Sequence, residues 1–235
     1  MYNYDVTGKT VLVTGSSKGL GKKIALTFAA HRYGIILHGR DEEALKEIKE
    51  RVLECDVICD VVIGDITEDQ TITDLAECAS KRDIGILINN AGVYSYNTLS
   101  DISTEEIKNI MNVNMIAPAL LTKKIFNIFK ERNGGLIINV NSTAGKHFNE
   151  YEAAYSASKH GLRGFMGCFQ YEALKFNIHV INAYLGAMNT DMVRNRSDKD
   201  KLINVIEVAQ TFYEISQNYK SMRISEIDIL RKIYK

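Results

Sequence analysis

Short runs of aliphatic and β-branched residues alternate with longer helical patterns along almost the whole chain. Strands are expected at residues 10–14, 34–38, 57–63, 84–88, 135–140, 178–184 and 224–230, with helices at 19–31, 42–54, 67–80, 103–131, 151–176 and 200–217. Several of the apolar runs lack strict alternation, which is typical of strands covered on both faces. Because parallel strands are joined by right-handed crossovers, this order predicts a doubly wound α/β fold: a parallel sheet of about seven strands with helices on both faces.

The sequence contains few features that would mark a boundary between domains. Its 235 residues include one proline, Pro118, and no low-complexity linker or short repeat. Residues 1–235 are therefore predicted to form one large α/β domain. The polar stretch within residues 191–207 would follow the sixth strand and form a short loop or lid on the substrate side. A mobile flap and a plain solvated connection both agree with its composition.

The charge balance limits the partners to be expected. The 29 basic and 29 acidic residues cancel, and no basic stripe favours nucleic acid or an anionic membrane. The first fifteen residues contain no apolar run long enough for a signal peptide or a membrane span, so a cytoplasmic protein is expected.

The cysteines give no sign of a redox or metal site. The four are Cys55, Cys59, Cys78 and Cys168, and they form neither a CxxC pair nor a metal-ligand spacing with histidine. Buried free thiols are therefore expected, and no metal site is predicted.

A glycine-rich turn follows the first expected strand. Residues 14–21 read TGSSKGLG, and a helical pattern continues from them. Glycines at such positions permit positive φ angles and let the backbone approach a pyrophosphate, which then lies at the positive end of the helix. The three glycines are a weak signal alone, but their place between a strand and a helix indicates a dinucleotide site. A glycine-rich turn that binds no ligand is the alternative.

The end of the second strand indicates which dinucleotide is bound. An acidic residue there would bind the 2′-hydroxyl of NAD, but this chain has His38, Gly39 and Arg40, followed by Asp41. Arg40 can bind a 2′-phosphate through two hydrogen bonds, and Lys18 adds a second positive charge. Asp41 is expected to point outward as the N-cap of the next helix. The pattern therefore favours NADP(H) over NAD(H).

Three further residues form a candidate catalytic group. Tyr155 and Lys159 lie four residues apart on an expected helix, so their side chains share one face. A phenol with a pKa of ~10 is a poor base at neutral pH, and a nearby positive charge favours the phenolate. Ser142 can donate a hydrogen bond to a substrate oxygen as charge develops on it. A solvated tyrosine beside a solvated lysine is the alternative for this spacing taken alone.

Together these motifs resemble the short-chain dehydrogenase/reductase family, from about residue 8 to residue 192. The segment 14–21 resembles its TGxxxGxG turn, 89–92 its NNAG motif, and Ser142, Tyr155 and Lys159 its serine and YxxxK motif. Asn114 aligns with the helix asparagine whose local distortion holds a water joined to the lysine. The turn differs from TGxxGxxG, which is typical of the longer sugar-epimerase branch.

The resemblance implies a Rossmann fold, bound NADP(H) and a complete catalytic tetrad. Tyr155 would protonate a carbonyl oxygen during hydride transfer, or act as base in the reverse direction, with protons relayed through the ribose, Lys159 and a water near Asn114. The tetrad residues are Asn114, Ser142, Tyr155 and Lys159, and the implied cofactor contacts are Gly15, Ser17, Lys18, Gly19, Leu20, Gly21, Arg40, Asp65, Ile66, Asn90, Ala91, Gly92, Tyr155, Lys159 and Thr190.

The chain departs from the family pattern on the substrate side. Leu185-Gly186 replaces the usual Pro-Gly after the sixth strand, which is expected to loosen the following loop slightly and to alter the pocket. The segment after Thr190 is short, which suggests an open site. The candidate substrate contacts are Ser142 and Tyr155 together with Tyr94, His147, Phe148, Tyr151, Tyr184 and Met192.

The function expected from the resemblance is the interconversion of a small-molecule carbonyl and a secondary alcohol. The sequence does not rank 3-oxoacyl thioester reduction, sugar or polyol oxidation and broad carbonyl reduction. A sensor or scaffold that binds NADP(H) without turnover is the alternative. The resemblance also implies a homodimer or homotetramer built on residues 103–131 and 151–176, with a set of apolar residues that face either a partner or the core: Phe126, Phe129, Phe165, Met166 and Phe169.

Overall fold

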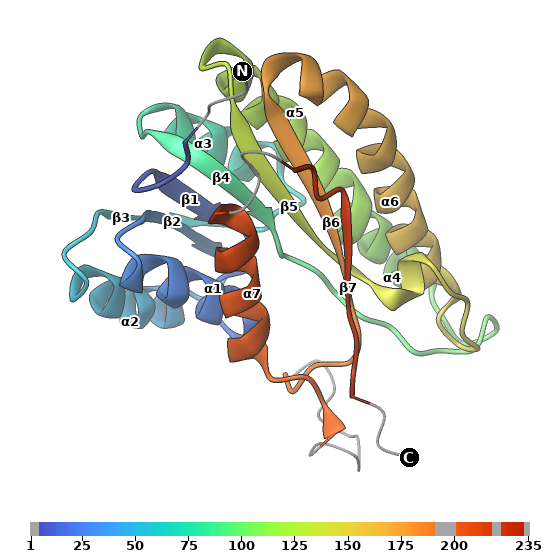
Figure 1. Ribbon diagram of the computed structural model, residues 1–235. Coiled ribbons are helices and arrows are strands. Elements are labelled where there is room, and N and C mark those ends of the chain that lie inside the picture. The colour runs from blue at the N-terminus through green and yellow to red at the C-terminus, as the bar shows by residue number, and fades with distance from the viewer. Residues whose placement is uncertain (1–4, 191–200, 218–221, 233–235) are drawn as a thin grey trace.

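One parallel sheet organises the chain. In the computed structural model, which describes residues 5–190, 201–217 and 222–232, seven strands pair in the order β3-β2-β1-β4-β5-β6-β7 (Figure 1). The strands are β1 (Thr10–Val13), β2 (Gly34–Gly39), β3 (Cys59–Ile63), β4 (Ile84–Asn89), β5 (Gly135–Ser142), β6 (Ile178–Leu185) and β7 (Glu226–Ile229). The predicted doubly wound α/β fold is confirmed. The strand order reverses between β1 and β4, where such sheets open a crevice at the carboxyl ends of the strands.

Helices cover both faces of this sheet (Figure 1). Apolar side chains of α1, α2 and α7 form one core with the sheet, and those of α3, α5 and α6 form the other. The helices are α1 (Gly19–Ala30), α2 (Glu42–Leu53), α3 (Asp69–Ser80), α4 (Thr104–Met111), α5 (Ala117–Glu131), α6 (Ala153–Ala173) and α7 (Val205–Gln217). Short 3₁₀ turns follow β5 at Thr143–Gly145 and α6 at Leu174–Phe176.

The expected long helix over residues 103–131 is interrupted. A π-helical turn, Asn112–Ile116, separates α4 from α5. Pro118 has no N–H to donate to the carbonyl of Asn114 four residues earlier, so the regular α-helical ladder fails at this point. The Asn114 side chain also bonds the backbone of Val93, accepting from its N–H at 2.8 Å and donating to its carbonyl at 2.9 Å. The proline and the asparagine together account for the break.

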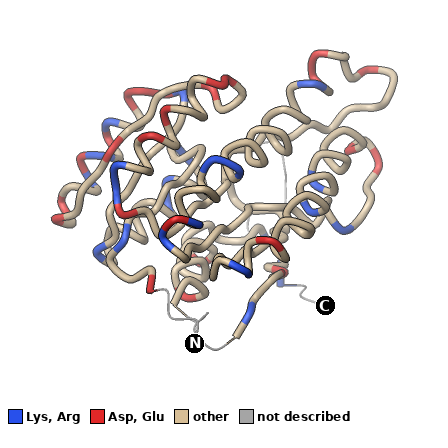
Figure 2. Tube along the Cα trace, turned by 90° about the horizontal axis from the view of Figure 1, so that it is seen from above, with Lys and Arg blue, Asp and Glu red and all other residues tan. Residues whose placement is uncertain are grey.

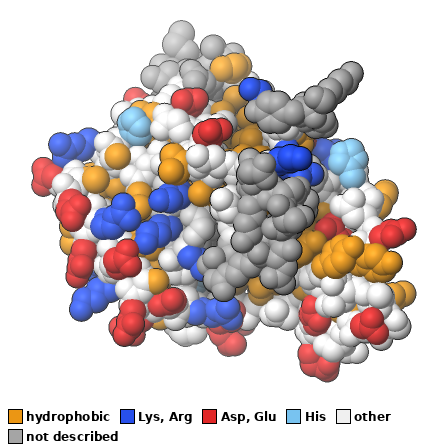
Figure 3. Space-filling model, turned by 90° about the horizontal axis from the view of Figure 1, so that it is seen from below, with side chains coloured by type: hydrophobic (Ala, Val, Ile, Leu, Met, Phe, Trp, Pro, Cys, Tyr) orange, Lys and Arg blue, Asp and Glu red, His pale blue; other side chains and the backbone are white. Residues whose placement is uncertain are grey.

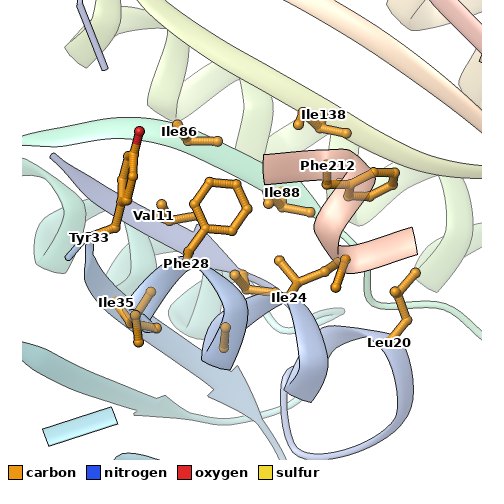
Figure 4. Packing of buried hydrophobic residues seen from close by; sticks show 14 of the residues in the cluster. Val11, Leu20, Ile24, Phe28, Tyr33, Ile35, Ile86, Ile88, Ile138 and Phe212 are labelled. Atoms are coloured by element: carbon orange, nitrogen blue, oxygen red, sulfur yellow. The ribbon is translucent and has the colours of Figure 1, made fainter. Parts of the chain in front are cut away.

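The core between α1, α7 and the sheet is rich in aromatic rings. Phe28 is fully buried and packs edge-on against Tyr33, with ring centroids 5.2 Å apart, and against Tyr213 at 5.8 Å. Figure 4 shows Phe28 among aliphatic side chains of β1 and β4, on the side that faces Phe212 of α7. These rings join the N-terminal and C-terminal parts of the chain across one face of the sheet.

The apolar residues considered for a partner helix divide into two groups. Phe129 and Met166 are fully buried in the core, so a partner-facing position for these two is wrong. Phe126 packs on Phe169 of the same chain, with centroids 5.2 Å apart, while Phe165 is 39% exposed. Of this group, Phe165 is therefore the residue most open to a partner.

The prediction that the cysteines are buried holds for Cys59 alone. Cys55 and Cys78 are partly buried, and Cys168 is exposed. Cys168 lies three residues after exposed Phe165 on α6, and positions three apart share a helix face. Tertiary position, not residue type, decides its exposure.

Basic and acidic residues are interspersed along the outer helices (Figure 2). No helix in the described ranges is long and apolar enough to span a membrane.

Candidate functional site

A cavity of about 1060 Å³ lies at the carboxyl ends of the strands. This volume is slightly above the usual range for ligand pockets of about 300–1,000 Å³, which suits an extended ligand. Every residue predicted to contact the cofactor lines it: Gly15, Ser17, Lys18, Gly19, Leu20, Gly21, Arg40, Asp65, Ile66, Asn90, Ala91, Gly92, Tyr155, Lys159 and Thr190. Strand ends that are distant in sequence thus contribute to one cavity.

The glycine-rich turn between β1 and α1 is held against the segment after β4. Gly15 has a φ of +63°, and a Cβ there would lie 2.9 Å from the Cα of Ala91. The Asn90 side chain donates to the carbonyls of Thr14 at 2.8 Å and Gly15 at 3.0 Å. Lys18, the N-cap of α1, makes no side-chain hydrogen bond to the first turn. The N–H groups of that turn therefore have no capping side chain and can bind an anion, as a dinucleotide phosphate requires.

His38 contributes to this turn, which the sequence did not predict. Its Nδ1 accepts the Gly15 N–H at 3.2 Å, and the backbone N–H of His38 donates to Ser16 Oγ at 2.9 Å. Burial lowers the pKa of His38 to about 4, so the imidazole is neutral and can act as this acceptor. His38 therefore helps to fix the conformation of the turn.

The predicted 2′-phosphate end of the cavity carries Arg40. Its guanidinium is 75% exposed and pairs with Asp65, Nη1 to Oδ2, at 3.2 Å. Asp65 also accepts from the N–H of Thr67 at 2.9 Å, and this hydrogen bond is the main cause that lowers the pKa of Asp65. Asp41 is exposed and accepts from the Ala44 N–H at 3.0 Å, so it forms the predicted N-cap of α2. Arg40 keeps further N–H donors for a ligand, because a guanidinium has five.

Tyr155, Ser142 and Lys159 face the same cavity from α6 and from the end of β5. The Lys159 Nζ atom lies 5.8 Å from the centre of the Tyr155 ring and donates to the carbonyl of Val140 at 3.1 Å. The pKa of Tyr155 is raised to about 12, chiefly by burial, while a hydrogen bond with Ser142 opposes the rise. In the protein without ligand, Tyr155 is therefore protonated at neutral pH.

Asn114 lies behind these residues instead of in the cavity lining. It is 1% exposed, and its Nδ2 also donates to Ser158 Oγ at 3.1 Å, next to Lys159 on α6. A Cβ on Gly92 would lie 3.3 Å from Asn114 Oδ1 and 3.9 Å from Lys159 Nζ. The structure thus brings all four predicted tetrad residues into one region.

Lys159 should give folding stability an identifiable pH dependence. Burial lowers its pKa from 10.5 to about 8. Between these values the unfolded chain binds a proton that the folded protein does not, so the free energy of unfolding gains about 1.4 kcal/mol per pH unit as pH rises. Lys159→Met removes this gain. We expect urea denaturation between about pH 7.5 and 10 to show that the free energy of unfolding of wild type rises, relative to that of the variant, by about this slope. A difference that stays constant over that range would contradict the lowered pKa.

The predicted substrate contacts are only partly brought together. Tyr94 lines the cavity, and its ring packs edge-on against that of Tyr155 at 5.0 Å. Tyr151 instead lines a smaller cavity of about 170 Å³ next to Tyr155. His147 is exposed and outside the lining of either cavity, so the geometry gives no support for substrate contact.

Three further candidates have other positions. Phe148 is 83% exposed and stacks on His160. Tyr184 is fully buried, and its hydroxyl donates to Glu226 at 2.8 Å, so a substrate contact is wrong for Tyr184. Met192 lies outside the described residues, as do residues 191–200 of the predicted lid; the end of that stretch, from Val205, begins α7.

The segment in which Leu185-Gly186 replaces the family's usual Pro-Gly forms part of the cavity wall. Leu185 is the last residue of β6, pairs with Ser142 and Ile229, and is 3% exposed. The Gly186 N–H donates to the carbonyl of Ile229 at 2.9 Å, which ties the start of the loop to β7. In the segment after β5, Lys146 forms an ion pair with Asp228 of β7 at 2.9 Å. Strand β7 therefore contacts both the segment that follows β5 and the segment that follows β6.

Sequence reasoning missed several polar residues on the substrate side of the cavity: Tyr96, Asn149, Glu150, Glu152 and Arg231. Glu152 lies three residues before Tyr155, at the N-cap of α6, and this spacing was the available signal.

Known proteins resemble this chain in sequence and in structure. Residues 9–201 match the family model described as short chain dehydrogenase. Dehydrogenase/reductase SDR family member 7 of Mus musculus is 31% identical over 199 residues, which are 82% of this chain and 59% of the mouse protein. An uncharacterized oxidoreductase of Thermotoga maritima is 33% identical over 175 residues, 74% of this chain and 69% of that protein. The chain thus spans less than two thirds of the mouse relative's length.

A solved structure agrees over nearly the full length. An alcohol dehydrogenase from the archaeon Thermococcus sibiricus, complexed with 5-hydroxy-NADP, superimposes with a TM-score of 0.88 at 21% identity and covers 97% of each chain. At this identity the likeness shows the fold. Family match, fold and the order of the motifs agree: the chain belongs to the short-chain dehydrogenase/reductase family of oxidoreductases.

Proposed function

We propose that the protein is an NADP(H)-dependent oxidoreductase that interconverts a small-molecule carbonyl and a secondary alcohol. The observation that carries the proposal is one cavity lined both by the glycine-rich turn with Arg40 and by Ser142, Tyr155 and Lys159. A dinucleotide held by the turn would extend toward these side chains, because all of them open onto the same space.

Each residue of the group has a distinct chemical task. When bound, the nicotinamide supplies or accepts the hydride at the carbonyl carbon. In the reductive direction Tyr155 donates its phenolic proton to the substrate oxygen, and Ser142 donates a hydrogen bond to the same oxygen. Lys159, charged below about pH 8, favours the phenolate that remains. Asn114 positions the helix segment beside Lys159 through its bonds to Val93 and Ser158.

The preference for NADP(H) rests on Arg40 and on the role of Asp41. The Asp41 carboxylate accepts from the Ala44 N–H at the start of α2 and does not line the cavity, so it is not placed to bind a ribose 2′-hydroxyl there. Arg40 lines the cavity, and its guanidinium is directed to Asp65 from a largely exposed position. In support, a metagenomic short-chain oxidoreductase of the same fold was solved in complex with NADP.

Arg40→Ala is expected to weaken NADPH binding by about tenfold to a hundredfold and to leave NADH binding nearly unchanged, because the guanidinium would contact the 2′-phosphate that NADH lacks. Fluorescence titration with both cofactors measures this. The matched control is Arg51→Ala, an exposed arginine of α2 outside the cavity lining. Equal or tighter NADH binding by wild type would contradict the NADP(H) assignment.

Turnover distinguishes the enzyme from a cofactor-binding sensor. The proposal expects oxidation of NADPH with at least one member of a broad carbonyl panel. Tight NADPH binding without turnover across that panel would favour the sensor or scaffold. Assembly as a homodimer or homotetramer remains a prediction, for which the exposed Phe165 on α6 is the available structural support.

A further inference from the structure

Past Tyr155 the cavity continues into a corner rich in hydrogen-bond acceptors. Tyr94, Asn149, Glu150 and Glu152 line this corner. The Glu152 carboxylate accepts from the Tyr94 hydroxyl at Oε1 and from Asn149 Nδ2 at Oε2, both at 2.8 Å. A carboxylate has about four lone-pair positions, so two of them are open to a ligand.

The corner lies beside the proposed reacting group. Tyr94 packs edge-on against Tyr155, with ring centroids 5.0 Å apart, and carries Glu152 on its hydroxyl. The negative charge of Glu152 contributes to the raised pKa of Tyr155, after burial. A substrate whose oxygen contacts Tyr155 therefore places its neighbouring atoms within reach of Glu152.

Among the described residues, the basic side chains that line the cavity come from other segments than those that form this corner. Lys18 and Arg40 lie at the turn after β1 and at the end of β2. Lys159 lies 5.8 Å from the Tyr155 ring, and its Nζ donates to the carbonyl of Val140. Arg231 lines the cavity from the segment after β7, with its backbone near Gly186. The loops after β4 and β5 are at the right of Figure 1, and on that side Figure 3 shows acidic and hydrophobic side chains together at the lower right, with most basic side chains on the left.

We propose that Glu152 determines substrate specificity: the substrate carries a hydroxyl or ammonium group near its carbonyl, and anionic substrates are disfavoured. The inference rests on the proposed oxidoreductase function and narrows its substrate class to polyhydroxylated or amino carbonyl compounds. A hydroxyl or ammonium group can donate to the open lone pairs of Glu152, whereas a carboxylate or phosphate meets a like charge there.

A purely structural role for Glu152 makes a different prediction. If the carboxylate only held Tyr94 and Asn149 in place, its loss would affect all substrates in the same proportion. A role in recognition instead changes the order of preference among substrates. The test therefore compares substrates of one skeleton that differ in a single substituent.

The experiment uses a broad carbonyl panel in which each ketone skeleton occurs unsubstituted, hydroxylated, aminated and carboxylated. Wild type is expected to favour the hydroxylated and aminated members over the carboxylated one by about tenfold or more in kcat/KM. Glu152→Gln should lower kcat/KM for the aminated ketone by about tenfold and raise it for the carboxylated one, with a small change for the unsubstituted ketone.

Two further variants serve as comparisons. Glu172→Gln changes an exposed glutamate on the same helix, outside the cavity lining, and should leave the order of preference unaltered. Tyr94→Phe removes one bond to Glu152 but keeps its charge, so the aminated ketone should still be preferred over the carboxylated one.

The possible failures are distinct. Equal efficiency of wild type with all four substituents, or a uniform loss in Glu152→Gln, would overturn the role of Glu152 and leave the oxidoreductase proposal standing. If folded wild type oxidises neither NADPH nor NADH with any member of the panel, the proposed function is wrong and this inference falls with it.

Discussion

Replacing Tyr155 with phenylalanine is expected to lower kcat by about 10²–10⁴-fold, the usual contribution of a positioned general acid or base. The phenyl ring preserves the edge-on packing against Tyr94 and removes only the hydroxyl that would exchange a proton with the substrate. NADPH affinity should change little, since the phosphate-binding turn is untouched. Steady-state kinetics with the best carbonyl of the panel, together with a fluorescence titration, separates the two quantities.

Tyr171→Phe is the matched control for this result. Tyr171 lies on the same helix, is 65% exposed and does not line the cavity. Its loss of a hydroxyl should leave kcat unchanged. A Tyr155→Phe variant that keeps more than about a tenth of wild-type kcat would show that another group supplies the proton.

Phe28→Ala should lower the free energy of unfolding by about 3–5 kcal/mol, the usual cost of deleting a fully buried phenylalanine. Phe28 is fully buried and packs edge-on against Tyr33 and against Tyr213 of α7, so loss of its ring would leave a cavity between α1 and α7. Urea denaturation at fixed pH measures the change. The main effect should be on stability, because Phe28 does not line the cofactor cavity.

Phe148→Ala removes the same side chain from an exposed position and is the control. Phe148 is 83% exposed, although it stacks on His160, so its removal should cost within about 0.5 kcal/mol. If both variants lost a similar amount of unfolding free energy, burial of Phe28 in the core would not explain its contribution to stability.

The sequence predicts the fold and the candidate site to different depths. Strand and helix positions follow from patterns a few residues long, and these patterns place Tyr155 and Lys159 on one helix face without further information. The break of the predicted helix at Asn114 was signalled by Pro118, four residues later, but its π-helical form depends on the bonds to Val93 from another segment.

Residues whose role depends on distant neighbours were missed or misplaced. His38 holds the glycine-rich turn only because β2 pairs beside β1, and the hydroxyl of the buried Tyr184 donates to Glu226 of β7. The Glu152 carboxylate accepts a hydrogen bond from Tyr94, which lies in the loop after β4. None of these contacts has a local sequence pattern, since each joins residues more than about twenty positions apart.

The strand order also bears on when the cavity can exist during synthesis. A domain generally folds as a unit during synthesis, and the wall of this cavity includes residues from Gly15 to Arg231. The segments that follow β5 and β6 both contact β7, through the ion pair of Lys146 with Asp228 and the hydrogen bond from Gly186 to Ile229. Strand β1 is synthesised first and lies in the middle of the sheet, whereas β7 is synthesised last and lies at its edge. A nascent chain can therefore acquire a complete site only after residue 231 has left the ribosome.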